Sequence, residues 1–261
     1  MIARLVFGLV VPAAGSGLAM RVDLFARALG RHLGITVEHR HAASYEALGD
    51  DVRANRIDLA WLPPIIFIRL GELVRPIGSI LRGGAAAYES ALVTLASSPW
   101  QSLEGLRGAR AGWVDRSSAS GYVLPLVNLV LRGIDPQTTF KSETFHGSHR
   151  SLMQALRDGL CDVAGTYARI DERRQVKHGA WSEVEGTTVR ALATFGEVPP
   201  DVLAVRSFLA PRIGDDIFAA LRDICLEDMA LVESVFGGQE LKEGLAPGYD
   251  ALRQAMDLSP R

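Results

Sequence analysis

The sequence predicts an α/β protein built from two lobes, and three observations lead to that prediction. First, short apolar segments typical of buried strands alternate with segments of helical periodicity, and this pattern occurs twice, over residues 4–62 and 109–165. Second, the 26 glycines and 12 prolines are dispersed along the chain, which favours many short turns. Third, 261 residues with 48% hydrophobic content are enough to bury a full core.

The first occurrence of the pattern predicts a strand at residues 4–11 and then a helix that ends at Gly30 or Gly34. A strand at 35–38, a helix from 45 to about 55 and a strand at 57–62 follow, and Pro63 and Pro64 end the last strand. The apolar positions that recur at helical spacing in the first helix are Leu18, Val22, Phe25, Ala26 and Leu29.

The second occurrence predicts a second sheet. Its expected strands are residues 109–114, 142–145 and 161–165, and its expected helices are 121–132 and 149–158. The extended segments 88–95 and 188–194 are expected to connect the lobes, and helices near 215–236 and 249–256 to complete the chain. We therefore expect one discontinuous lobe of residues 1–92 and 196–261, a second lobe of residues 93–195, and ligand binding between them.

Charge and cysteine usage exclude several classes of protein. With 28 Lys and Arg against 30 Asp and Glu, and no basic block, we expect no nucleic-acid binding. No apolar run is long enough to span a bilayer, so no membrane insertion is expected. Cys161 and Cys225 are far apart and predict two buried thiols rather than a disulfide. His39 and His41 alternate without an evident third ligand, so we expect no metal site.

The amino-terminal segment allows two interpretations. Arg4, the apolar residues 5–11 and the small residues near 15 are similar to a signal peptide, but the same apolar run reads equally well as a buried first strand. We favour the strand. The expectation is then a cytoplasmic protein, or a periplasmic one whose export signal is not part of this sequence.

Three segments place a hydroxyl residue where a helix is expected to begin after a strand or an extended piece: 44–45, 117–121 and 147–149. A helix start exposes unpaired N–H groups and partial positive charge, so three of them around one cleft could bind a phosphoryl or phosphonyl group without a P-loop lysine. Serine is also an ordinary helix cap, and each segment by itself could do no more than stabilise its helix.

Individual side chains in these segments are candidates for ligand contact. Ser118 and Ser120 are the best candidate hydroxyls, and His149 at the first turn of its helix could donate a hydrogen bond. A capping or core histidine is the alternative. Tyr45 and Tyr88 could close a polar pocket with their hydroxyls, or serve as packing aromatics.

These residues are part of a longer resemblance. The stretch 115–125, the segments 133–136, 147–149 and 159–163, together with Tyr45, residues 57–64 and Tyr88, resemble the phosphate, phosphite and phosphonate substrate-binding proteins of ABC transporters. The resemblance extends to about Arg206 and implies a type II periplasmic-binding-protein fold with mainly parallel sheets and two hinge crossovers. It also implies a small oxyanion as ligand, a permease as partner, a monomer and no cofactor.

The resemblance further implies that the phosphonyl oxygens meet Ser118, Ser120, His149, Tyr45 and Tyr88. Ala119 departs from the family, where a threonine commonly adds a hydroxyl, although the backbone N–H of Ala119 can still donate.

In aminoalkylphosphonate binders of this family, a distal Glu and Asp hold the ligand ammonium. An alignment without gaps from Cys161 to Arg169 puts Arg169 at the Glu position, and Asp201 is assigned to the Asp position. An arginine would repel an ammonium group in a closed cleft, which argues against 2-aminoethylphosphonate and favours a second anion or none. Arg169 could instead pair with Asp201 or Asp171 and be purely structural.

The sequence thus predicts a solute-binding protein without catalytic residues that closes on a phosphonate or phosphate-type oxyanion. Two alternatives stay open. One is a cytoplasmic enzyme on the same fold, similar to menaquinone- or thiamine-pathway relatives, with Ser120, His149 and Asp201 as catalytic candidates; no GxSxG motif supports it. The other is a cytoplasmic oxyanion sensor that signals through a separate partner.

Overall fold

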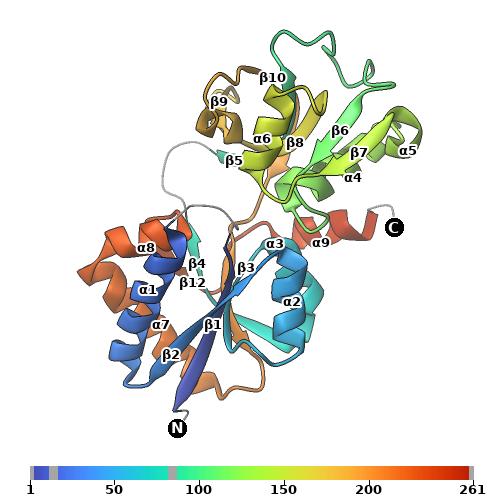
Figure 1. The fold of residues 1–261 in the computed structure, drawn as a ribbon. Helices are drawn as coiled ribbons and strands as arrows, with labels where there is room; N and C mark the ends of the chain where they lie inside the picture. The colour runs from blue at the N-terminus through green and yellow to red at the C-terminus, as the bar shows by residue number, and fades with distance from the viewer. Residues whose placement is uncertain (1–2, 12–16, 82–86, 259–261) are drawn as a thin grey trace. The chain divides into compact units, whose positions relative to one another are not determined.

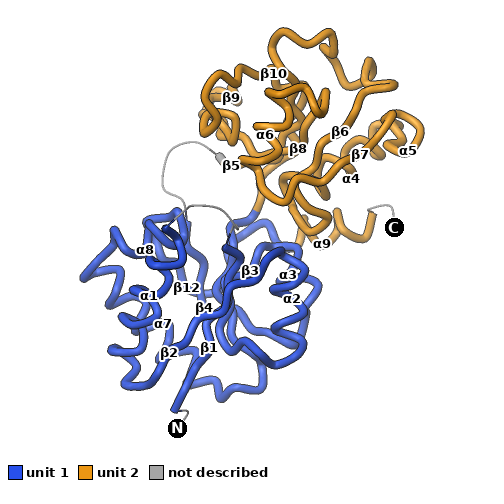
Figure 2. The backbone as a smooth tube through the Cα atoms, in the orientation of Figure 1, with its two compact units in different colours: residues 1–83, 199–249 blue, residues 84–198, 250–261 orange. Residues whose placement is uncertain are grey.

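The computed structural model describes residues 3–11, 17–81 and 87–258, and it divides the chain into two compact units (Figures 1 and 2). Unit 1 comprises Met1–Gly83 and Pro199–Tyr249, and unit 2 comprises Gly84–Val198 and Asp250–Arg261. The division falls at 83/84 and 198/199, where we expected 92/93 and 195/196, and residues 250–261 group with unit 2 rather than with the first lobe.

Unit 1 contains a six-stranded sheet with the order β12-β4-β11-β3-β1-β2. Strand β1 is parallel to β2 and β3, whereas β11 is antiparallel to β3 and β4, and β12 is antiparallel to β4. The strands are β1 (Arg4–Val10), β2 (Thr36–Ala42), β3 (Leu59–Leu62), β4 (Val74–Leu81), β11 (Val202–Arg206) and β12 (Glu240–Glu243). The helices are α1 (Leu18–Leu33), α2 (Tyr45–Arg53), α3 (Pro64–Leu70), α7 (Pro211–Glu227) and α8 (Met229–Phe236), with a 3-10 turn at Gly71–Leu73.

The helices of unit 1 bury apolar stripes against the two faces of this sheet. Phe25 of α1 packs on Phe7 of β1 and edge-on against Phe236 of α8, with ring centroids 5.4 and 4.9 Å apart. On the other face, α2 and α3 contribute Leu48 and Ile66 to a second apolar cluster. Gly34, with φ at 66°, ends α1 in the left-handed conformation that glycine adopts without strain.

Unit 2 contains a sheet with the order β10-β5-β8-β6-β7, and β9 pairs with β8 outside this path. Strand β6 is parallel to β7 and β8, whereas β5 is antiparallel to β8 and β10. The strands are β5 (Ala87–Leu95), β6 (Arg110–Trp113), β7 (Ser142–Phe145), β8 (Val163–Ile170), β9 (Val176–Gly179) and β10 (Val189–Glu197). The helices are α4 (Leu124–Leu131), α5 (Pro136–Thr139), α6 (His149–Arg157) and α9 (Tyr249–Leu258), with a π-helical turn at Ala119–Val123 and a 3-10 turn at Ala180–Glu183.

The structure confirms the α/β class and corrects several details of the prediction. Each sheet is mixed, parallel over three neighbouring strands and antiparallel over the others, rather than mainly parallel. The helix expected near 215–236 is two helices, because the Asp228 side chain accepts from the backbone N–H of Leu231 and begins α8 anew. The helix expected from residue 121 starts two residues earlier, as the π-helical turn.

The two cysteines differ in environment. Cys161 in unit 2 is buried, and burial together with the neighbouring Asp162 charge raises the pKa of its thiol to about 12. Cys225 in α7 of unit 1 is only half-buried, unlike the fully buried thiol expected, and burial raises its pKa as well. Both are free thiols.

Candidate functional site

The segment between β6 and α4 forms a tightly held, serine-rich turn. Ser118 is the N-cap of the π-helical turn, and its Oγ accepts from the backbone N–H of Gly121 at 3.0 Å. The backbone N–H of Ser117 donates to Asp115 Oδ1 at 2.7 Å. Ser118, Ala119 and Ser120 are all at most 5% exposed. π-Helical turns occur frequently at functional sites, so this turn is the centre of the candidate site.

Two glycines allow this turn to lie close to the sheet. A Cβ on Gly121 would be 2.4 Å from Val114 Cγ2 and 2.8 Å from Ser118 Oγ. A Cβ on Gly165 of β8 would be 2.9 Å from the carbonyl oxygen of Gly121 and equally close to the Trp113 ring. The serine-rich turn can therefore take this position only because both residues lack a side chain.

A line of polar contacts runs from β5 through the serine-rich turn to α6 and β8. The Tyr88 hydroxyl oxygen lies 3.3 Å from Ser120 Oγ, which lies 3.4 Å from His149 Nε2. His149 Nδ1 lies 2.9 Å from Thr166 Oγ1. Thus Tyr88, Ser120 and His149, three residues that the sequence singled out, come together within unit 2.

Four further residues lie around these groups and were not predicted from the sequence: Ser90, Thr166, Tyr167 and Glu183. Ser90 of β5 donates from Oγ to the backbone carbonyl of Ser120 at 2.9 Å. Thr166 contacts the imidazole, as described above. The Tyr167 ring stacks on Tyr88 and meets His149 edge-on, with centroids 5.2 and 5.0 Å away, and its hydroxyl donates to Glu183. Period-two alternation places Ser90 on the same strand face as Tyr88, but nothing in the sequence says which residue it reaches.

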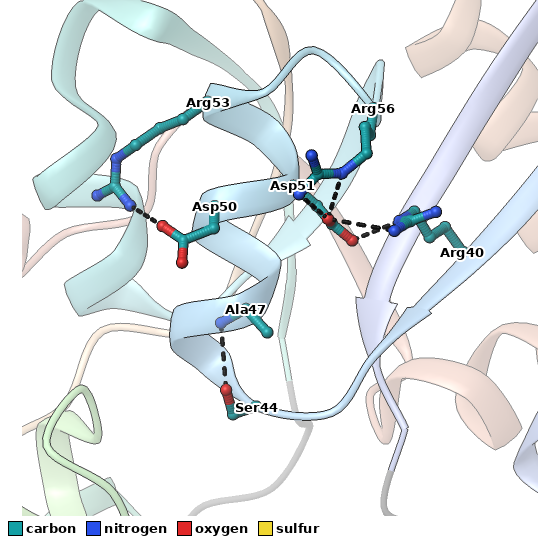
Figure 3. Close-up of polar contacts among 7 residues, drawn as sticks. All are labelled: Arg40, Ser44, Ala47, Asp50, Asp51, Arg53 and Arg56. Atoms are coloured by element: carbon teal, nitrogen blue, oxygen red, sulfur yellow. Dashed lines mark hydrogen bonds and ion pairs between the residues drawn. The ribbon is translucent and has the colours of Figure 1, made fainter.

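The other two helix starts also carry serine caps. Ser148 Oγ accepts from the N–H of Ser151 at 3.1 Å, so His149 is the first residue of α6. In unit 1, Ser44 Oγ accepts from the N–H of Ala47 at 3.1 Å and begins α2 (Figure 3). The predicted caps are therefore present at all three helix starts.

Two predicted site residues belong to unit 1. Tyr45 is the first residue of α2, half-buried against the apolar cluster between α2, α3 and the sheet. Asp201 directly precedes β11. The other six predicted residues, all of unit 2, are Tyr88, Ser118, Ala119, Ser120, His149 and Arg169.

Arg169 lies on β8 directly opposite Tyr88 of β5, and opposite His178 of β9. Directly opposed residues of antiparallel strands share a face of the sheet, so Arg169 lies beside Tyr88. The predicted alternative of an Arg169–Asp171 pair is not observed: Asp171 instead pairs with Lys177 at 2.9 Å and accepts from two backbone N–H groups.

The two histidines of β2 lie against each other. The rings of His39 and His41 stack with centroids 4.8 Å apart. Burial is the main cause that lowers the pKa of His41, and the nearby His39 lowers it further. Among the residues that the structure describes, no group of three or more His, Cys, Asp or Glu side chains could hold a metal ion.

Unit 2 of this two-unit α/β fold thus brings hydroxyl and imidazole groups together at two helix starts, as in proteins that bind small ligands. Comparison with known families makes this specific. Residues 9–244 match the family described as the periplasmic substrate-binding protein of phosphonate ABC transporters, and the chain belongs to that family.

Individual relatives agree with this assignment. The phosphate-import protein PhnD of Mycolicibacterium smegmatis is 23% identical over 222 residues, which cover 79% of this chain and 68% of that protein. PhnD1 of Prochlorococcus marinus, solved with methylphosphonate, has a TM-score of 0.75 at 17% identity, covering 98% of this chain and 97% of that one. XAC2383 of Xanthomonas citri, solved with ATP, has a TM-score of 0.75 at 20% identity, covering 98% and 96%. At these identities the solved structures show a shared fold.

The family assignment has direct consequences. The chain is a substrate-binding protein of a phosphonate or phosphate ABC transporter, which implies a small-molecule ligand and a permease partner, and the family is periplasmic. In the part of the chain that the structure describes, no helix combines the length and the apolar character needed to cross a bilayer.

Proposed function

We propose that this protein binds a tetrahedral phosphonate or phosphate-type oxyanion without catalysing its conversion. In this proposal the anion contacts Tyr88, Ser118, Ser120, His149 and the backbone N–H of Ala119, all of unit 2, and the sequence resemblance adds Tyr45 as a further candidate. The observation that carries the proposal is the meeting of the Tyr88 hydroxyl, Ser120 Oγ and His149 Nε2 beside a buried helix start.

The lengths of these contacts support an anion as ligand. Ser120 Oγ is 3.3 Å from the Tyr88 hydroxyl and 3.4 Å from His149 Nε2. Hydrogen bonds are most often about 2.7–2.8 Å long for O–H···O and about 2.9–3.0 Å for N–H···O. Each of the three groups can donate to an anionic oxygen, and such charge-assisted bonds are shorter and stronger than neutral ones. The partial positive charge of the helix start adds to the attraction.

The same geometry favours binding over catalysis. A serine next to a histidine is reminiscent of a nucleophile and its base, but catalytic histidines of that kind are oriented by a third group that stabilises the imidazolium, commonly a carboxylate. Here the atom next to His149 Nδ1 is the Thr166 hydroxyl, which carries no charge. Incubation with phosphate monoesters and alkylphosphonates, followed by phosphorus NMR, should give no turnover; turnover that disappears in His149→Ala would contradict the proposal.

Isothermal titration calorimetry tests the binding site. Phosphate, phosphite and methylphosphonate are titrated into the wild-type protein and into Ser120→Ala, and we expect the variant to bind the preferred anion roughly tenfold or more weakly. Ser102→Ala is the matched control, because Ser102 lies in the same unit and its Oγ accepts from the N–H of Gly105 and not from a residue of the candidate site. Equal affinities for wild type and Ser120→Ala would show that Ser120 does not contact the ligand.

We further propose that the ligand is not an aminoalkylphosphonate. Arg169 lies beside Tyr88, and a guanidinium there would repel a ligand ammonium group. The guanidinium of Arg169 would instead favour a ligand with a second anionic group, or one with no further charged group. Titration with 2-aminoethylphosphonate and phosphonoacetate decides this, and tighter binding of the former would refute it. Arg169→Glu should improve the relative affinity for the amine.

The remaining parts of the proposal concern the cellular setting. We propose a monomer that delivers its ligand to a permease. Light scattering during size-exclusion chromatography tests the monomer. Fractionation of the native host tests the compartment: recovery in the periplasm supports transport, whereas recovery in the cytoplasm would favour the sensor or the enzyme on the same fold.

A further inference from the structure

Thr166 is one of the few polar residues of unit 2 that is fully buried. It lies in β8 with an exposed fraction of 0%, and its Oγ1 is 2.9 Å from His149 Nδ1. Within the described part of the chain, this is the one hydrogen bond found for the Thr166 side chain. Its hydroxyl therefore depends on the imidazole for a partner.

That dependence decides the direction of the hydrogen bond. If Nδ1 carried the proton and donated to Thr166 Oγ1, the Thr166 O–H would itself be buried without an acceptor, which costs free energy. If the Thr166 O–H donates to an unprotonated Nδ1, both groups are satisfied. A neutral imidazole has one N–H, so its proton is then on Nε2, the nitrogen 3.4 Å from Ser120 Oγ.

We infer that Thr166 is a positioning residue that fixes the tautomer of His149, so that Nε2 acts as a hydrogen-bond donor to the oxyanion. The role of Nε2 in anion binding rests on the proposed function, whereas the position of the His149 proton follows from the hydrogen bond with Thr166 alone. With the opposite tautomer, the Nε2 lone pair would face a negatively charged oxygen and repel it. Tyr167, the next residue of β8, meets the imidazole edge-on and fixes the plane of the ring.

A second buried threonine shows what a purely structural hydroxyl does in this unit. Thr94 of β5 is also 0% exposed, and its Oγ1 donates to the backbone carbonyl of Asp162 at 2.8 Å. Both residues are β-branched, buried and located in central strands. They differ in that Thr94 donates to a backbone carbonyl, whereas Thr166 contacts a side chain of the candidate site.

The test combines a spectroscopic readout with binding. Long-range proton–nitrogen NMR on the full-length, unliganded protein identifies which ring nitrogen of His149 is protonated and whether the other accepts a hydrogen bond. Calorimetry with phosphate and methylphosphonate measures affinity. The variants are Thr166→Val, which removes the hydroxyl and keeps the shape, Thr166→Ser, which keeps the hydroxyl, and Thr94→Val as the control.

We expect a protonated Nε2 and a hydrogen-bonded Nδ1 in the wild-type protein. In Thr166→Val the unprotonated Nδ1 loses its hydrogen-bond donor, so its resonance should move to the position of a ring nitrogen that accepts no hydrogen bond. The affinity for the anion should fall about tenfold. Thr166→Ser should restore both, and Thr94→Val should change neither, even if it lowers the melting temperature.

Other outcomes overturn the inference. A protonated Nδ1 in the wild-type protein, or an unchanged Nδ1 resonance in Thr166→Val, would show that Thr166 does not set the tautomer. If Thr166→Val does not fold, the wild-type and Thr166→Ser spectra still decide the question. If the wild-type protein binds none of the anions, the proposed function fails while the NMR result still decides the role of Thr166.

Discussion

Each unit contains a polar network around one buried side chain, and the two networks satisfy the polar atoms of that side chain differently. In unit 1, Asp51 of α2 is 7% exposed and is held by Arg40 of β2 and by Arg56, whose Nε lies 2.6 Å from Asp51 Oδ1 (Figure 3). In unit 2, Ser120 is 3% exposed and its neighbours are the Tyr88 hydroxyl and the His149 imidazole, at 3.3 and 3.4 Å. The first network joins a carboxylate to two guanidinium groups through short contacts, whereas the contacts of Ser120 in the second network are long and involve a hydroxyl and an imidazole.

The difference indicates which network is suited to a ligand. Burial by itself would raise the pKa of Asp51, but hydrogen bonds from Arg40 and Arg56 and their charges outweigh it and hold the pKa below its usual value. Two cations already satisfy that carboxylate, so the network serves the fold. The network of unit 2 consists of donors that could each form a better bond with an anion.

The largest expected effect comes from a steric clash, and it tests whether the serine-rich turn must lie close to the sheet. In Gly121→Ala the new Cβ would overlap with Val114, so the turn must move, and we expect a loss of about 3 kcal/mol in the free energy of unfolding. Anion affinity should fall at least tenfold. Chemical denaturation and calorimetry measure the two quantities.

Gly105→Ala is the control for this substitution, because the nearest atom to its Cβ, Ser102 Oγ, is 3.6 Å away. It should change stability by less than about 1 kcal/mol. Equal stability of the two variants would mean that the close approach of Gly121 to the sheet is not required.

The next effect concerns the charged network. Asp51→Asn should cost about 2 kcal/mol at neutral pH, because two hydrogen bonds to arginines lose their charge. Since the pKa of folded Asp51 is depressed, its contribution is complete above about pH 5 and disappears as the pH falls through the folded value. Denaturation at several pH values should therefore show the wild-type advantage over Asp51→Asn shrinking toward acid.

The adjacent Asp50 provides a matched control. Its carboxylate pairs with Arg53 on the exposed side of α2, with the Asp50 side chain 61% exposed (Figure 3). Asp50→Asn should change stability by less than about 1 kcal/mol at any pH. A pH-independent difference between wild type and Asp51→Asn would show that the charge of Asp51 is not what stabilises unit 1.

The smallest effect distinguishes a cap from a ligand contact. Ser118→Ala removes the acceptor of the Gly121 N–H, which should cost about 1 kcal/mol of stability. If Ser118 also contacts the anion, affinity falls in addition; Ser102→Ala, which removes a similar acceptor from Gly105, should leave affinity unchanged. Weakened stability with normal affinity would assign Ser118 to the cap alone.

The sequence predicted those elements whose pattern is strong and local. Strands β1 and β3 and helices α1, α2 and α6 have clear periodicity and capping residues, and they were found within a few residues. Strand β4 was missed because Pro76 lies within it, and a proline argues against a strand unless the ladder is irregular there. The register of β11 on β4 indeed shifts between Leu203 and Ala204, next to Pro76.

The candidate site was predictable to a similar degree. Hydroxyl residues at helix starts are visible in a sequence, which is why Ser118, Ser120 and His149 could be named as candidates. Ser90 and Thr166 were not, because a strand pattern gives the face of a residue but not its partner across the sheet. The partner depends on the register of β5 and β8, which follows from tertiary packing.

Each unit contains one free thiol, and the reactivity of that thiol reports how often the interior of the unit becomes exposed to solvent. With a pKa of about 12, Cys161 is almost entirely protonated at neutral pH, and its burial keeps alkylating reagents out. Its modification rate therefore measures how often unit 2 exposes its interior. Cys225 does the same for unit 1 from a half-buried position, so mass spectrometry of partly alkylated protein can follow the two units separately without any introduced label.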